Sequence, residues 1–146
     1  MPRVKLTEQQ DYEFHYTLTL QPRDINRGGH LGNDALVSLL GTATAHMFHS
    51  LGVNESDLGD GHTGIIMADL SVEYKAEAFM FDQLRIDTHA GGFARVGFRL
   101  FQRVTRDVDV IALAETGLVT FNYSSRKVAP VPKALVEALR TWRAGS

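Results

Sequence analysis

Side chains that can move protons are concentrated between residues 24 and 34. This stretch contains two carboxylates, Asp24 and Asp34, two amides, Asn26 and Asn33, and the imidazole of His30, with glycines between them. A carboxylate can take a proton from water or attack a carbonyl carbon, and an imidazole can bind or transfer a proton. The residue types therefore make this stretch a candidate site for acid–base or nucleophilic chemistry.

The chain contains no cysteine. This excludes disulfides, thiolate nucleophiles and cysteine-bound zinc, and it fits a reducing compartment. Any nucleophile must then be an oxygen atom of a side chain or of water. No pair of histidines has a carboxylate at matching helical spacing, so we predict no metal site.

Composition and charge limit the partners. The 146 residues, 44% of them hydrophobic, predict one domain over residues 1–146. The net charge of -2, with both signs interleaved, argues against a nucleic-acid partner or an anionic membrane. The polar N-terminus and the absence of an apolar stretch of ~20 residues predict a cytoplasmic protein. A small molecule or another protein is the expected partner.

A predicted strand and a predicted helix bracket the candidate residues. Every second residue from 12 to 20 is apolar and the residues between are polar, which is typical of a half-buried strand. Apolar residues then recur at helical spacing from Asn33 or Asp34 to Leu51 without a proline. Small and hydroxylated residues occupy the other side of this helix, which indicates a helix covered on nearly all sides.

Four further strands are predicted with no helix between them. Apolar and polar residues alternate over 66–74, 84–88 and 94–100, and residues 110–121 are apolar at both parities. The Gly91-Gly92 pair predicts the hairpin between the second and third of these strands. A short helix is expected near the C-terminus, over 134–142. The order of elements predicts an α+β domain with an antiparallel sheet wrapped around one buried helix.

The segment 23–40 reads RDINRGGHLGNDALVSLL and resembles the motif that joins the first strand to the central helix in hotdog-fold acyl-CoA thioesterases of the 4-hydroxybenzoyl-CoA thioesterase group. That motif is roughly Asp-x-Asp-x-x-Gly-His-x-Asn-Asn, and the matching positions are Asp24, Asn26, Gly29, His30, Gly32 and Asn33. The resemblance implies a hotdog fold, with about five antiparallel strands around one long central helix. It implies hydrolysis of an acyl-CoA thioester to free acid and coenzyme A, which enters as part of the substrate, so no separate cofactor is expected. It also implies a homodimer or homotetramer with active sites between subunits.

The glycine-rich turn before the helix has two interpretations. Its unpaired N–H groups and the helix dipole can form an oxyanion hole, with the N–H of Asn33 as the donor by resemblance. Alternatively, Asn33 or Asp34 only caps the helix, and the glycines supply positive φ angles. His30 is interpreted as a positioning residue that packs over the turn and hydrogen-bonds the backbone.

The chain departs from the family motif at the usual catalytic carboxylate, where it has Asn26. An amide has no useful basicity near neutral pH. Either Asp24 or Asp34 supplies the carboxylate, or Asn26 orients a water that another group activates, or the protein binds a thioester without cleaving it. Asp24 ranks first because it leaves an extended turn on the same side as Asn26. Asp34 ranks second because the helix dipole lowers its basicity.

Basic residues on a later strand have two interpretations as well. Arg95, Arg99 and Arg103 alternate, as on a solvated strand face. Alternatively, Arg95 and Arg99, together with Lys75, bind the phosphates of coenzyme A. The acyl group is then expected in an apolar slot along the central helix, lined by residues such as Met67 and Phe48. A hotdog dehydratase that uses His30 is the third possibility.

Overall fold

The computed structural model describes residues 5–145. Six strands form one sheet within these residues. They are β1 (Phe14–Thr19), β2 (Thr63–Tyr74), β3 (Gln83–Ala94), β4 (Gly97–Arg106), β5 (Asp109–Asn122) and β6 (Lys127–Val128). The helices are the 3₁₀ helix η1 (Pro22–Asp24), the long helix α1 (Asn33–Ser50) and the terminal helix α2 (Lys133–Ala144).

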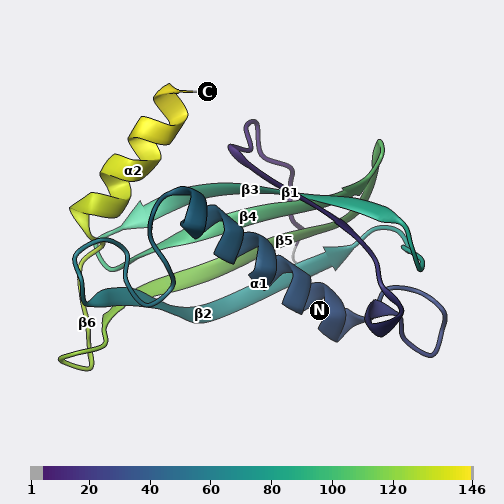
Figure 1. Cartoon of the computed structure of the whole chain (residues 1–146), viewed down its shortest axis with the longest axis horizontal. Helices are drawn as coiled ribbons and strands as arrows, with labels where there is room; N and C mark the ends of the chain where they lie inside the picture. The colour runs from purple at the N-terminus through teal and green to yellow at the C-terminus, as the bar shows by residue number, and fades with distance from the viewer. Residues whose placement is uncertain (1–4, 146) are drawn as a thin grey trace.

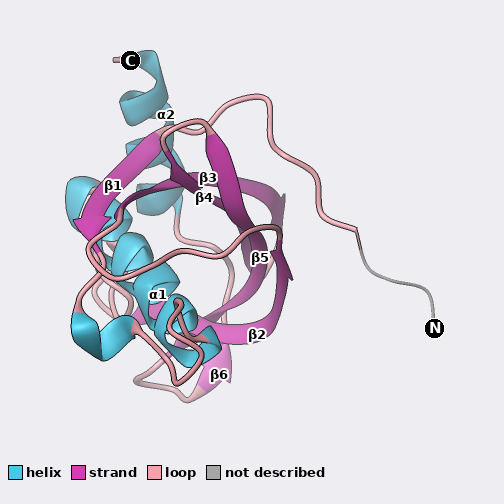
Figure 2. Cartoon of the chain, turned by 90° about the vertical axis from the view of Figure 1, so that its right-hand side faces the viewer, coloured by secondary structure: helices cyan, strands magenta, loops and turns pink. Residues whose placement is uncertain are grey.

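The sheet is antiparallel and curls around α1 (Figures 1 and 2). The strand order is β1-β3-β4-β5-β2, and the two-residue β6 pairs with the end of β5. Helix α1 lies along the concave face, while α2 covers one end of the molecule (Figure 1). This is the hotdog fold that the resemblance implies, with β6 as a short addition to the five expected strands.

One side of α1 is buried against the sheet, because its apolar residues recur every three or four positions. Leu36, Leu40 and Met47 are among the buried residues of this side. The helix begins after Gly32 and ends before Gly52, which has a φ of 75°. The sequence predicts a helix covered on nearly all sides, but Val37 and Gly41 are exposed in the single chain. Their face of α1 therefore stays open to a ligand or to a second subunit.

The predicted hairpin at Gly91-Gly92 is wrong. Strand β3 continues to Ala94 and β4 begins at Gly97, so the turn lies at residues 95–96. The register of the two strands shifts between Gly91 and Ala94, and Gly92 has a φ of 58°. The glycines therefore form an irregularity within β3. Glycine adopts the positive φ of this position without the steric strain that a β-carbon would cause.

A second irregularity changes which side chains of β2 face inward. The register between β2 and β5 shifts between Met67 and Asp69. As a result, Ile65 and Met67 face α1 before the shift and Leu70 faces it afterwards. The alternation in the sequence predicts Ile66 in place of its neighbours, because period-two counting does not register an inserted residue.

No helix within residues 5–145 is long and apolar enough to cross a membrane.

Candidate active site

The glycine-rich turn is closed by backbone pairing and by one side chain. Ile25 and Leu31 form an isolated bridge. Within this loop, the Oδ1 of Asn26 accepts hydrogen bonds from the N–H groups of Gly28 at 2.9 Å and His30 at 3.4 Å. The amide oxygen of Asn26 therefore holds the turn in shape. Its Nδ2 group makes no hydrogen bond within residues 5–145, so it remains available as a donor.

Helix α1 starts with unpaired N–H donors. The first backbone bond into the helix runs from Leu36 N–H to the carbonyl of Gly32, at 2.9 Å. Gly32 is the N-cap, and no side chain caps the helix. The N–H groups of Asn33, Asp34 and Ala35 therefore have no partner in the described part of the chain. The structure does not show the capping by Asn33 or Asp34 that was one of the two interpretations, and it leaves donors for an anion at the positive end of the helix dipole.

The two candidate carboxylates differ in exposure. Asp24 is 9% exposed, and its Oδ2 accepts a hydrogen bond from the N–H of Gln21 at 2.8 Å. Asp34 is exposed, and its Oδ1 lies 2.9 Å from the point where a β-carbon on Gly32 would stand. The Cβ of Asn26 lies 3.5 Å from the same point. Asn26 and Asp34 therefore flank Gly32, while Asp24 is engaged in the preceding turn.

A cavity of about 360 Å³ brings three of the predicted residues together. His30, Asn33 and Lys75 line it, together with Tyr74 and Glu77. The Nδ1 atom of His30 lies 3.2 Å from the carbonyl oxygen of its neighbour Leu31, a contact that fits the positioning role. Burial raises the pKa of Tyr74, so its hydroxyl stays protonated at neutral pH. Asp24, Asn26 and Asp34 are not among the residues that line this cavity.

A narrower slot of about 140 Å³ lies between α1 and the concave face of the sheet. Val37 and Gly41 line it from the helix, and Met67 and Leu100 line it from the strands. Met67 is one of the two residues predicted to line an acyl slot. Phe48, the other, is fully buried in the core and does not line it.

The three predicted phosphate-binding residues do not meet in one chain. Arg99 forms ion pairs with Asp69 and Glu115 across the sheet, which neutralise its charge. Arg95 lies in the β3-β4 turn, at the end of the sheet opposite to Lys75, which follows β2. Of the three, only Lys75 lines the cavity next to the start of α1.

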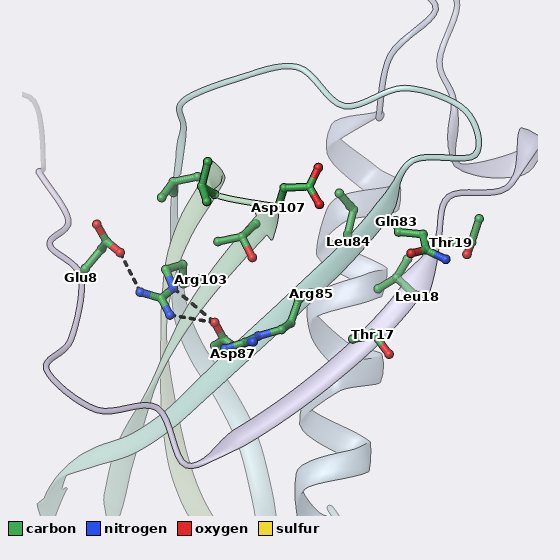
Figure 3. A pocket seen from close by; sticks show the side chains of 13 residues that line it. Glu8, Thr17, Leu18, Thr19, Gln83, Leu84, Arg85, Asp87, Arg103 and Asp107 are labelled. Atoms are coloured by element: carbon green, nitrogen blue, oxygen red, sulfur yellow. Dashed lines mark hydrogen bonds and ion pairs between the residues drawn. The ribbon is translucent and has the colours of Figure 1, made fainter.

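A separate polar cluster lies on the convex face of the sheet, at a cavity of about 720 Å³ (Figure 3). Asp87 is buried there and bonds Arg85, Arg103 and His15, and Arg103 also bonds Glu8 of the N-terminal segment. Burial alone would raise the pKa of Asp87, but the bonds from Arg85, His15 and Arg103 outweigh it and hold the pKa below its usual value. Because these charges are paired, we interpret the cluster as a structural tie between the N-terminal segment and the sheet.

Among residues 5–145, no group of three or more histidines and carboxylates could hold a metal ion.

Comparison with known families identifies the chain. The model of the thioesterase-like superfamily matches residues 20–139, which include the turn, α1 and strands β2 to β6. The chain belongs to the thioesterase-like superfamily. Membership supports thioester hydrolysis as its general chemistry. A comparison of the sequence with curated proteins finds no match.

Solved structures similar to this superfamily member show the same fold. A 1,4-dihydroxy-2-naphthoyl-CoA thioesterase from Synechocystis has a TM-score of 0.78 at 18% identity, covering 87% of this chain and 95% of that one. A gentisyl-coenzyme A thioesterase has a TM-score of 0.75 at 22% identity, covering 85% and 98%. A DHNA-CoA thioesterase from Staphylococcus aureus has a TM-score of 0.77 at 14% identity, covering 90% and 91%. At these identities the likeness establishes the hotdog fold alone.

Sequence reasoning about this superfamily member missed several residues that line the two cavities. Tyr74 closes a predicted strand and was counted as an apolar strand residue. Gln102 and Thr116 stand on predicted strands, where single polar residues carry no recognisable motif. Gln102 falls on the apolar parity of β4, and this was the signal that could have drawn attention to it.

Proposed function

We propose that this protein hydrolyses an acyl-CoA thioester to a free acid and coenzyme A at the N-terminus of α1. The observation that supports this most directly is the set of unpaired N–H groups at Asn33, Asp34 and Ala35, next to an exposed carboxylate, in a member of the thioesterase-like superfamily. A thioester carbonyl oxygen gains negative charge when water adds to its carbon. Donors fixed in advance at that point stabilise the charge without reorganisation.

The water must lose a proton as it attacks, and the carbon–sulfur bond then breaks to release the thiol of coenzyme A. We propose Asp34 as the general base, because it is exposed and flanks Gly32 together with Asn26. Asp24, which the sequence ranks first, remains the second candidate because its carboxylate already accepts the N–H of Gln21. We propose that the free Nδ2 of Asn26 donates to the water or to the thioester oxygen.

Coenzyme A is proposed to reach the site through the cavity lined by His30, Asn33 and Lys75. Lys75 has its ammonium group 2.8 Å from Glu73, and it is the one predicted phosphate-binding residue at this cavity. Because both charges of the pair are partly exposed, the pair is weak and the lysine can turn toward a phosphate. The acyl group would extend from the helix start into the slot that Met67 lines.

Release of free thiol from a panel of acyl-CoA thioesters tests the proposal. Asp34→Asn is expected to lower kcat by ~10²-fold to 10⁴-fold, the usual cost of losing a general base. Asp24→Asn provides the comparison between the two carboxylates. Asp11→Asn is the matched control, because Asp11 is an exposed aspartate outside the turn. Unchanged turnover in Asp34→Asn and loss in Asp24→Asn would reverse the assignment.

A second function is favoured by one observation, namely that Asn26 stands where the family has its carboxylate and uses its oxygen to hold the turn. In that case the protein binds an acyl-CoA without cleaving it. The parent chain would then release no thiol from any thioester that it binds, and Asn26→Asp would create turnover. Measuring binding and thiol release on the same samples separates the two functions.

A further inference from the structure

Two side-chain oxygens lie on the floor of the slot between α1 and the sheet. They belong to Gln102 of β4, which is 2% exposed, and Thr116 of β5, which is 6% exposed. In the sheet register, Leu100 stands opposite Thr116 and Gln102 stands opposite Ala114. Gln102 and Thr116 are therefore diagonal neighbours on the concave face, and both line the slot.

The hydrogen bonds of these residues leave acceptors unused. The Nε2 of Gln102 donates to the carbonyl of Leu40 and to the hydroxyls of Thr44 and Thr88, at 3.2–3.3 Å. Its Oε1 accepts no hydrogen bond within residues 5–145, and neither does the Oγ1 of Thr116. Neither atom is sealed away from surrounding space, and the space that both residues line is the slot. An acceptor that a cavity reaches takes its hydrogen bond from whatever occupies the cavity, so these two oxygens are available to a donor group on a ligand.

Gly41 marks the part of α1 where the slot stays open. It lies in the middle of α1 and lines the slot, although glycine is a poor residue for a helix interior. A β-carbon at this position would meet nothing within 4 Å. Close packing inside the chain therefore does not require a glycine there, and the residue keeps the slot wide.

We infer that Gln102 and Thr116 are specificity-determining residues that accept a hydrogen bond from a hydroxyl group on the acyl chain. This inference rests on the proposed function, because it places the thioester at the N–H of Asn33. Gly41 lies about 12 Å further along the helix, at a rise of 1.5 Å per residue. A single ring joined directly to the thioester is too short for a hydroxyl on it to reach the part of the slot next to Gly41. The substrate class is an acyl-CoA of medium length with a hydroxyl toward its far end.

Two thioesters of the same chain length provide the test, octanoyl-CoA and ω-hydroxyoctanoyl-CoA. Binding is measured by calorimetry and thiol release by a colorimetric assay, both on the full chain. The hydroxylated substrate is expected to have at least a tenfold higher kcat/KM, because a site with a buried acceptor discriminates against an analogue that leaves the acceptor unpaired. The same preference is expected in the dissociation constants.

Three variants identify the residues responsible. Thr116→Val keeps the shape and removes the hydroxyl, and together with Gln102→Met it should bring the preference close to one. Thr88→Val is the matched control, because Thr88 bonds Gln102 but does not line the slot. Gly41→Ala should lower kcat/KM for both octanoyl substrates while acetyl-CoA is affected little, with the fold checked by circular dichroism.

The outcomes separate this inference from the proposed function. Equal binding and equal turnover of the two octanoyl thioesters would overturn the specificity role while hydrolysis stands. A preference in binding without thiol release would support the specificity role and overturn hydrolysis. If neither thioester binds, the specificity role fails, and thiol release from the panel of other acyl-CoA thioesters decides whether hydrolysis stands. If the Thr116→Val, Gln102→Met double variant still prefers the hydroxylated thioester, other residues bind the hydroxyl group.

Discussion

At Asn26, one side chain has a structural and a chemical use. Its Oδ1 accepts N–H bonds from Gly28 and His30, which an aspartate at the same position would accept as well. These bonds would stabilise the ionised form of such an aspartate and lower its pKa, whereas the nearby Asp34 would raise it. Asn26→Asp should therefore keep the turn intact, which makes it a clean probe of catalysis.

The backbone donor at Asn33 can be removed without disturbing the helix, which gives a prediction. Asn33 is the first residue of α1, where proline is favoured because the N–H has no helical partner. Gly32 before it has φ -76° and ψ 152°, the extended conformation that a following proline requires. Asn33→Pro should lower kcat by ~10²-fold to 10³-fold, as expected for a lost oxyanion donor.

Asn33→Ala is the control for this prediction, because it removes the side chain and keeps the N–H. Steady-state kinetics and a helix signal by circular dichroism should be recorded for both variants. If Asn33→Pro is folded and as active as Asn33→Ala, the oxyanion does not bind at this N–H.

The sequence predicts the turn at residue resolution but not the roles within it. Glycine, histidine and asparagine at fixed spacing are enough to predict a candidate site at the start of the helix. The exposure of Asp34 and the engagement of Asp24 by Gln21 depend on how the chain folds back, which the residue types do not encode. The parity of Gln102 draws attention to it, but its position next to Thr116 in the slot depends on the register of β4 with β5, which the residue types do not encode.

At the scale of elements, the periodicity of hydrophobic residues predicts the strands and helices well. The predictions are wrong where the register of two paired strands shifts. Helix α1 and all five long strands lie where hydrophobic spacing places them. The errors are the shift in β3 near Gly92 and the shift in β2 after Met67. The glycine pair in β3 resembles a turn in the sequence, and nothing in the composition of β2 marks its shift. Counting every second residue therefore assigns residues next to such a shift to the wrong face. For this reason Met67 faces α1, although the alternation predicts Ile66 there.

The charged cluster on the convex face of β3 predicts a pH-dependent stability. The folded pKa of Asp87 is lowered, so its stabilisation is complete above the ordinary aspartate pKa of about 3.9 and is lost as pH falls through the folded value. Asp87→Asn should lower the free energy of unfolding by about 3 kcal/mol at neutral pH, the lower end for a broken buried ion pair, because Arg85 and His15 are half exposed.

Urea denaturation at several pH values measures this difference. The gap between the parent and Asp87→Asn should narrow steadily as pH falls below 4. Asp109→Asn is the control, because Asp109 is largely exposed and only distantly paired with Arg106. A gap that does not change with pH would mean that Asp87 stabilises through shape and not through charge.

The single chain leaves one long edge of the sheet uncovered. Strand β2 pairs with no strand other than β5 among the described residues. On its other side the first residues bond a neighbouring loop, from Ile65 N–H to the carbonyl of Glu55, and the strand beyond them has no strand partner. Ile66 and Met67 on this strand are 42% and 55% exposed. Proteins normally protect such an edge, because an apolar unpaired strand recruits another. The open face of α1 at Val37 lies next to the same slot as Met67.

The resemblance implies a homodimer or homotetramer with sites between subunits. We propose that two copies of the chain join edge to edge along β2 and that each slot is completed by the partner. Light scattering should give twice the mass of one chain at micromolar concentration. The double variant Ile66→Lys, Met67→Lys should be monomeric, because symmetry brings like charges together across the edge. Val108→Lys adds the same charge at an apolar residue that is 92% exposed, and it should remain dimeric.

Assembly and activity should then change together. Because Met67 lines the slot and lies on the edge strand, dissociation opens the slot to water and removes the surface that the partner contributes. Specific activity should fall when the parent chain is diluted through its dissociation range, and the fall should be absent in a covalently cross-linked dimer. A parent chain that is monomeric by light scattering would contradict the shared interface. Constant specific activity through a measured dissociation would leave a dimer whose sites are complete within each subunit, with the apolar edge serving assembly alone.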